Sequence, residues 1–199
     1  MKKEIRQTTE SPAVDKESRH VEGYAALFNS SSIPLVDWDG TFTETIAPGA
    51  FDGVAEVSDV KCLLNHNTSR GLLARARNGK GSLSLTVDER GLKYAFDAPN
   101  TALGDELLEG IRRGDISGSS FAFTVAKDTW EKLSDGTYAR TIDKVERLYD
   151  VSPVYDPAYP ETTVDARGLE ELRSAEEAAA EKCSTKMSNR TDETKALYL

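Results

Sequence analysis

The sequence predicts a mainly β protein, a small antiparallel β-barrel with peripheral helices. Short runs rich in β-branched and aromatic residues recur along the chain, separated by turn signals built from Gly, Pro, Asn and Asp. Only one internal segment has clear helical periodicity, and a strong hairpin turn, SDGT, joins two long runs near the end. With 199 residues, the chain can bury one good core and carry a short appendage.

The first third of the chain is predicted to consist of an arm followed by strands. Residues 1–18 are polar and charged without periodicity, so we expect a flexible arm with order beginning near Arg19. Strands are expected over 21–28, 41–46 and 60–66, and the segments NSSSIP and APGAFDG between them mark turns.

The middle of the chain is predicted to form a meander and then a helix. The runs 72–78, 81–88 and 91–98 follow one another at short spacing, with turn signals NGKG and DERG, as in an antiparallel meander. Over residues 101–114 the apolar side chains recur at helical rather than strand spacing, which predicts a helix. Thr101 can cap this helix and Gly114 can end it.

A serine-rich strand and its hairpin partner close the predicted domain, which spans 19–167. The run that begins ISGSSFAF should pair across SDGT with the run that contains Asp150. Residues 168–199 have strong helix formers but few large apolar side chains, and we expect a polar helical or disordered tail.

Composition excludes several function classes. The 25 Lys and Arg against 34 Asp and Glu give a formal charge of −9, which argues against nucleic acid and anionic membranes as partners. There is no apolar run of membrane-spanning length and no signal peptide, so we expect a cytoplasmic chain. The two cysteines, Cys62 and Cys183, do not suggest a disulfide framework.

Strand parity singles out Ser120 as a candidate nucleophile. Phe121 and Phe123 share one face of the serine strand, while Ser120 lies on a face of small residues that leaves room for another group. A serine nucleophile needs a base, and the chain has two histidines. His66 opens a loop at a strand end and is the better candidate, because His20 borders the polar arm.

A carboxylate is expected to orient the base. The candidates Asp143, Glu146, Asp150 and Asp156 lie on or after the strand paired with the serine strand. Asp150 is favoured because it sits inside the apolar run LYDVSPV, where an unpaired charge would be costly. A structural salt bridge from Asp150 to Arg112 or Arg113 is an equal alternative.

Other chemistries have less support. Cys62 is an alternative nucleophile, but four residues of strand would hold it roughly 13 Å from His66, so we expect a core residue. No metal, cofactor or phosphate site is expected, because ligand clusters and the lysine of a phosphate loop are missing from the sequence.

Six blocks in order resemble the prohead maturation proteases of tailed bacteriophages, a family similar in fold to the herpesvirus assemblins. They cover about residues 19–167 and read VEGYAALFNSSS, ETIAPGAF, VKCLLNHN, GSLSLTVDERGLKYAFDAPNT, GDISGSSFAF and LYDVSPVYDPAYPETTVDAR. The resemblance implies that His66 is the base and Ser120 the nucleophile, with Asp150 at the acidic third position. In SFAF, Ala122 replaces the glycine that is common in the family.

The resemblance also implies a function. The chain is expected to be a serine endopeptidase that cleaves scaffold protein, the scaffold segment of the major capsid protein, or both, and also itself, inside the assembling prohead in the host cytoplasm. A homo-oligomer is compatible with the sequence. Two alternatives stay open: a non-enzymatic capsid assembly or scaffold-binding β-module, and another serine hydrolase, although no G-x-S-x-G elbow is present.

Overall fold

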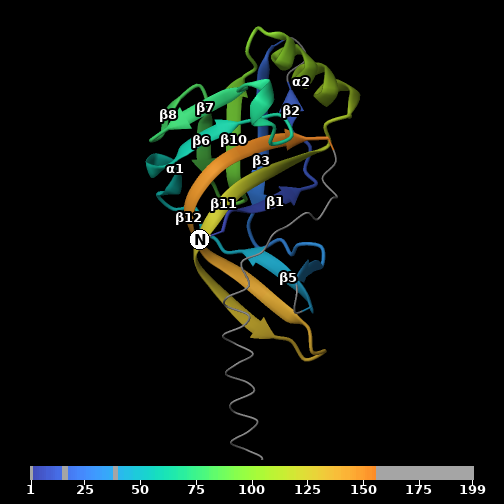
Figure 1. Cartoon of the computed structure of the whole chain (residues 1–199), viewed down its shortest axis with the longest axis vertical. Coiled ribbons are helices and arrows are strands. Elements are labelled where there is room, and N and C mark those ends of the chain that lie inside the picture. Colours follow the sequence, from blue (N-terminus) through green and yellow to red (C-terminus); the bar gives the residue numbers. More distant parts are fainter. Residues whose placement is uncertain (1, 15–17, 38–39, 156–199) are drawn as a thin grey trace, which may run out of the picture. The chain divides into compact units, whose positions relative to one another are not determined.

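The computed structural model describes residues 2–14, 18–37 and 40–155, and its strand-rich fold confirms the predicted class (Figure 1). One sheet has eight strands, with β1-β11-β12-β6-β7-β8 in order and β4 and β5 attached through β5 to β12; the other has the order β2-β3-β10-β9. The strands are β1 (Glu4–Thr8), β2 (Ala13–Val14), β3 (His20–Leu27), β4 (Leu35–Asp37), β5 (Gly40–Ile46), β6 (Asp59–Cys62), β7 (Ala74–Arg77), β8 (Lys80–Gly81), β9 (Ser84–Val87), β10 (Gly91–Asp97), β11 (Gly118–Lys132) and β12 (Tyr138–Val154). The helices are α1 (Val54–Val57) and α2 (Ala102–Arg113), with a 3₁₀ turn, η1 (Thr68–Arg70).

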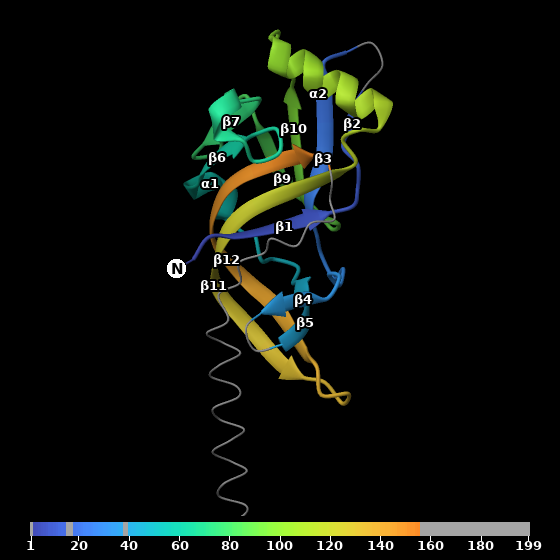
Figure 2. The same cartoon turned by 45° about the vertical axis from the view of Figure 1, so that its right-hand side comes forward.

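The long hairpin of β11 and β12 is the element that positions the site. Its register places Ser120 opposite Ser152 and Ala122 opposite Asp150, so the predicted pairing of the two runs is confirmed. Figure 2 shows the hairpin curving from the region of β6 toward β4 and β5. β12 also pairs in parallel with β5 at one end and with β6 at the other, which the prediction of a purely antiparallel arrangement did not include.

The N-terminal segment differs from the expected arm. Within residues 1–18, β1 pairs with β11 and β2 pairs with β3. Glu4 and Arg6 of β1 are buried because each finds a charged partner inside the protein, Glu4 with Arg140 and Arg6 with Glu44. In a sequence, charged residues such as these predict a segment exposed to solvent. In the fold they are buried and paired with one another.

Aromatic residues of the serine strand fill the core as strand parity predicts. The rings of Phe121 and Phe123 lie 4.7 Å apart, and Phe51 meets Phe121 edge-on at 5.6 Å. This leaves the opposite face of β11, with Ser120, for the site.

Helix α2 begins and ends where the sequence predicts. The Thr101 hydroxyl accepts the backbone N–H of Gly104, and Gly114 ends the helix in a left-handed conformation at φ 80°. Leu107 and Leu108 are buried in the core. Figures 1 and 2 both place α2 beside one end of β2, β3 and β10.

Two other expectations change. The strand predicted over 60–66 ends at Cys62, because the chain turns at Asn65 and His66, which both have positive φ. The predicted meander is divided between the sheets, since β7 and β8 belong to the larger sheet while β9 and β10 belong to the smaller one.

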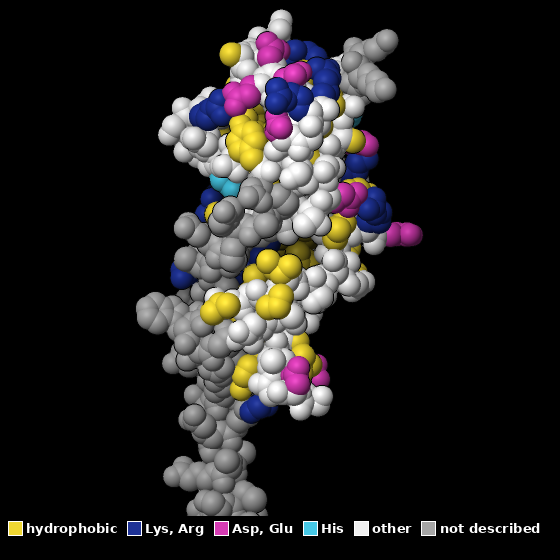
Figure 3. Space-filling model, turned by 90° about the vertical axis from the view of Figure 1, so that its right-hand side faces the viewer, with side chains coloured by type: hydrophobic (Ala, Val, Ile, Leu, Met, Phe, Trp, Pro, Cys, Tyr) yellow, Lys and Arg dark blue, Asp and Glu magenta, His cyan; other side chains and the backbone are white. Residues whose placement is uncertain are grey.

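The surface drawn in Figure 3 carries Lys, Arg, Asp and Glu side chains interspersed with one another. In the part of the chain that the structure describes, no helix has the length and apolar character of a membrane span. The predicted tail 168–199, the end of the predicted domain, Asp156 and Cys183 lie outside the described residues.

Candidate active site

The space beside Ser120 is occupied by an imidazole. Ser120 lies in β11 and is fully buried, and its Oγ is 2.5 Å from Nε2 of His66. The same hydroxyl lies within hydrogen-bond distance, 2.8 Å, of the backbone carbonyl oxygen of Arg6 on the neighbouring β1. The small-residue face of the strand therefore accommodates the ring of the predicted base.

His66 is held by a turn rather than by a strand. Asn65 and His66 have φ angles of 53° and 56°, which reverse the chain after β6 and bring the ring over the hairpin. The backbone N–H of Asn65 donates to the carbonyl oxygen of Pro153 at 2.9 Å, so the turn is fixed to β12. The side chain of Asn67 then accepts the N–H of Ser69 and caps η1.

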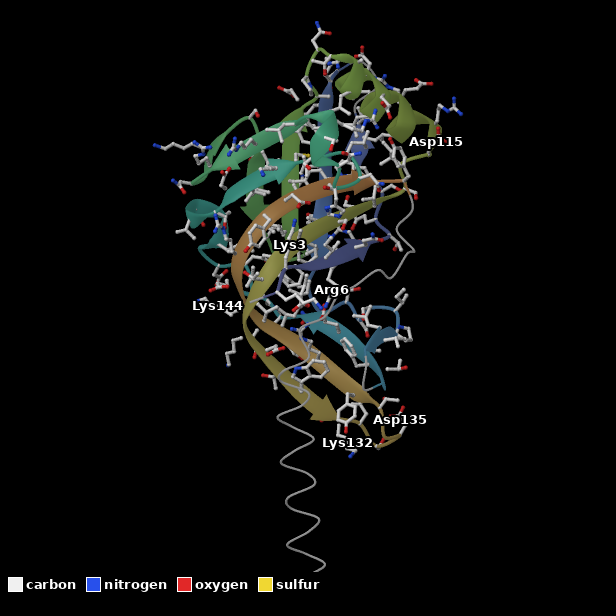
Figure 4. The ribbon with its side chains drawn as sticks, in the orientation of Figure 1. Lys3, Arg6, Asp115, Lys132, Asp135 and Lys144 are labelled. Carbon is white, nitrogen blue, oxygen red and sulfur yellow. The ribbon has the colours of Figure 1, made fainter. Side chains whose placement is uncertain are left out.

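The carboxylate of Asp150 faces the other nitrogen of the ring. Its Oδ1 lies 2.5 Å from Nδ1 of His66, and its Oδ2 accepts a hydrogen bond from Nζ of Lys3 at 3.2 Å. Figure 4 labels Lys3, which directly precedes β1, and Arg6 of β1, whose side chain pairs instead with Glu4 and Glu44. The alternative of a salt bridge to Arg112 or Arg113 is wrong, since Asp150 pairs with His66 and Lys3, and Arg113 pairs with Asp115.

Electrostatics keep Asp150 ionised although it is buried. Burial acts most strongly and raises the pKa of the carboxyl, but the hydrogen bonds from His66 and Lys3 and the electrostatic attraction that each exerts outweigh it. The net result is a pKa of Asp150 below its ordinary value. A carboxylate in this state accepts the Nδ1–H of the imidazole and leaves Nε2 free to accept a proton.

Hydroxyl, imidazole and carboxylate thus form a continuous chain of hydrogen bonds. In such a chain the hydroxyl oxygen can attack an electrophilic carbon while the imidazole takes its proton, and the carboxylate stabilises the imidazolium that results. The arrangement brings together a hydroxyl, a base and an orienting carboxylate, the groups that nucleophilic hydrolysis of an ester or amide by this route uses.

The remaining predicted candidates lie elsewhere. His20 is exposed and its Nδ1 is 3.0 Å from the exposed Asp97. Asp143 accepts a hydrogen bond from Thr129, and Glu146 accepts one from Thr124.

Cys62 is a buried core residue, as predicted, and burial raises the pKa of its thiol well above the ordinary value. A protonated thiol is a poor nucleophile. Among the described residues, no group of three or more His, Cys, Asp or Glu side chains could hold a metal ion.

Two residues of the site were missed. Ser152 Oγ donates to Asp150 Oδ1 at 3.1 Å and lies 3.2 Å from His66 Nδ1, and Lys3 pairs with Asp150. Alternation along a strand could have found Ser152, because residues 150 and 152 share a face of β12. No sequence signal points to Lys3, since its proximity depends on the pairing of β1 with β11.

A model of the caudovirus prohead serine proteases matches residues 6–177. The chain belongs to this family. It is also 29% identical over 162 residues to the prohead protease of Enterobacteria phage HK97. That alignment covers 78% of this chain but 64% of the phage HK97 protein, so the chain spans less than two thirds of this relative's length. No solved structure matches the chain with significance.

The family membership agrees with the resemblance of the six sequence blocks. The match begins within β1 and extends past the end of β12, so it includes the strands that carry Ser120 and Asp150 and the turn that carries His66. The hydrogen-bonded chain therefore lies inside the part of the molecule that the family shares.

Proposed function

We propose that this protein is a serine endopeptidase of phage prohead maturation, with Ser120 as nucleophile, His66 as general base and Asp150 as the carboxylate that orients His66. The observation that supports the proposal is the pair of 2.5 Å contacts that His66 makes, through Nε2 to Ser120 Oγ and through Nδ1 to Asp150 Oδ1. Ser120 lies 54 positions after His66 in the sequence, and Asp150 lies 84 positions after it. The imidazole of His66 nevertheless contacts both side chains.

The reaction follows from this geometry. Ser120 Oγ forms a bond to the carbonyl carbon of the substrate peptide while its proton passes to Nε2 of His66. The imidazolium then gives that proton to the departing amine as the carbon–nitrogen bond breaks, leaving an acyl-enzyme. A water molecule attacks the ester in turn, giving one proton to His66, which returns it to Ser120 as the second product leaves.

The substrates we propose are the scaffold protein, the scaffold segment of the major capsid protein, or both, together with the protease itself. Membership of the prohead protease family supports a role in the assembling phage head within the host cell. The identity of the scaffold and capsid proteins as partners is part of the proposal, as is action inside the prohead.

Co-expression with the scaffold and major capsid proteins of the same phage tests the proposed function. Wild-type protein should convert one or both proteins to shorter products on a gel, and Ser120→Ala should leave both at full length. Intact substrates beside a correctly folded wild type would favour the non-enzymatic β-module instead. A purified protein that cleaves p-nitrophenyl acetate but no polypeptide would favour another serine hydrolase.

A further inference from the structure

Among the described residues, Ser152 supplies the hydroxyl that contacts both His66 and Asp150. It lies on β12 directly opposite Ser120 and is fully buried. Its Oγ is 3.1 Å from Asp150 Oδ1 and 3.2 Å from His66 Nδ1. Nothing in the nucleophile, base and carboxylate scheme assigns it a role.

The direction of its hydrogen bonds follows from the state of Asp150. A carboxylate held ionised accepts hydrogen bonds strongly, so the single hydroxyl proton of Ser152 goes to Asp150 Oδ1. A lone pair of Ser152 Oγ then faces Nδ1 of His66. The Nδ1–H consequently has two acceptors, Asp150 Oδ1 at 2.5 Å and Ser152 Oγ at 3.2 Å.

His66 needs such a second anchor because its backbone lies outside the sheet. The residue sits in a turn with left-handed φ, so its ring is held by contacts of the side chain rather than by a strand ladder. A ring with Nδ1–H fixed on two acceptors presents an unprotonated Nε2 to Ser120. Rotation of the ring or the other tautomer would break both contacts at Nδ1 and remove the base.

We propose that Ser152 is a positioning residue that holds the tautomer and orientation of His66 through Asp150 Oδ1 and Nδ1. The inference rests on the proposed function and deepens it. Ser152 does not touch the reacting atoms; it acts on Ser120 only through the imidazole between them.

Labelling with a fluorophosphonate reagent tests the proposal without knowledge of the natural substrate. Ser120 Oγ would bond to phosphorus, fluoride would leave, and the serine proton would pass to His66, so the labelling rate depends on the base. In Ser152→Ala we expect the maximal labelling rate to fall roughly tenfold, with the half-saturating reagent concentration unchanged. Circular dichroism of Ser152→Ala shows whether the variant is folded, and so separates a slower labelling step from loss of labelling through misfolding.

Ser119→Ala is the matched control. Ser119 is also fully buried and hydrogen-bonded, but its Oγ lies 2.8 Å from the hydroxyl of Tyr94, on the core side of the strand rather than in the site. The same change of side chain at the neighbouring position should therefore leave the labelling rate near that of the wild type. Ser152→Thr keeps the hydroxyl and should recover part of the lost rate.

A second measurement reports the hydrogen bond directly. A short imidazole–carboxylate bond gives a far-downfield proton signal in NMR, which we expect to shift in Ser152→Ala and to stay in place in Ser119→Ala. A wild-type labelling rate and an unshifted signal in Ser152→Ala would overturn the inference. Failure of the wild type itself to be labelled would instead contradict the proposed function, while the NMR signal would still decide whether Ser152 holds His66.

Discussion

Ser120 has one hydroxyl proton and two acceptors within reach. Nε2 of His66 lies at 2.5 Å and the carbonyl oxygen of Arg6 at 2.8 Å. Only donation to His66 prepares the oxygen for attack, because a hydroxyl that donates to a carbonyl does not transfer its proton to the base. The contact of His66 with Asp150 matters for this choice, since an Nδ1–H that donates to Asp150 leaves Nε2 as the acceptor nitrogen of a neutral ring.

Replacement of Ser120 by Ala should abolish fluorophosphonate labelling and proteolysis with a small effect on stability. The change removes the nucleophile, but a buried hydrogen-bonded hydroxyl contributes only about 1 kcal/mol to the free energy of unfolding. Ser117→Ala, at a partly exposed position of the adjoining segment, should be labelled at the wild-type rate. A Ser120→Ala variant that still cleaves substrate would rule out Ser120 as the nucleophile.

Asp150→Asn should change the pH dependence of stability in a defined direction. The pKa of Asp150 is lowered in the folded protein, so ionised Asp150 stabilises the fold above the pKa of the unfolded chain, and this stabilisation is lost as pH falls through the folded value. Near pH 7 the wild type should have a higher urea midpoint of unfolding than the variant. This difference between the two midpoints should disappear only below about pH 4. A difference that disappears already at pH 6 would contradict the assignment.

At the scale of elements, β1 shows how a short strand can belong to the site. Its five residues pair with β11 in register, with Gln7 opposite Ser120, and the Arg6 carbonyl reaches the nucleophile. Lys3, just before the strand, pairs with Asp150. The polar composition of residues 1–18 conceals this role, because solvated and internally paired charges look alike in a sequence.

Deletion of residues 2–8 should therefore lower both stability and labelling. The deletion exposes one edge of β11 and removes buried partners of Arg140 and Glu44, which is costly for charges inside a protein. The midpoint of thermal unfolding should fall by several degrees. Gln7→Ala changes an exposed side chain of the same strand and should have the thermal midpoint of the wild type. A deletion variant with an unchanged thermal midpoint would instead support the expectation of a flexible arm.

Elements with strong local signals were predictable. The cap at Thr101, the end at Gly114 and the SDGT hairpin are set by neighbours in sequence, and all three agree with the structure. Strand parity selected Ser120, the loop at a strand end selected His66, and the apolar run selected Asp150. The family blocks point to the same three residues. Their contacts, and those of Lys3 and Ser152, depend on pairings between distant strands, which local patterns do not specify.

At the scale of the molecule, a buried ion cluster joins four strands. We define it as Glu4 and Arg6 of β1, Glu44 of β5, Asp128 of β11 and Arg140 of β12. Arg140 donates to Glu4 at 2.7 Å, to Glu44 at 2.9 Å and to Asp128 at 2.7 Å, and its own side chain is 1% exposed. The ion cluster connects β5 to β1, the strand that pairs with β11 beside Ser120.

Arg140→Met should destabilise the protein by about 3–5 kcal/mol, since removal of one partner leaves the buried carboxylates of the ion cluster without compensation. Chemical unfolding of the purified variant measures this loss. Lys144→Met, at an exposed position of the same strand, should change stability by less than about 0.5 kcal/mol. Equal effects of the two changes would show that the ion cluster contributes no more than a surface charge.

Self-cleavage, which is part of the proposed function, makes a prediction about the tail at 168–199. A segment that belongs to the same chain as the enzyme can meet the site at an effective concentration on the order of millimolar. Purified wild type should lose mass through cuts beyond about Gly168 during prolonged incubation, while Ser120→Ala keeps its full mass. Equal masses in intact-protein mass spectrometry would contradict self-cleavage.

The parallel pairing of β12 with β5 and β6 has a consequence for a chain emerging from the ribosome. β12 is the last strand of the described fold, yet its partners in these pairs were synthesised about a hundred residues earlier. Asp150 and Ser152 reach His66 only when this late strand docks. A nascent or truncated chain that ends before β12 therefore contains Ser120 and His66 but lacks Asp150 and Ser152. If the proposed mechanism holds, such a chain cannot align His66, and activity begins only once β12 has docked.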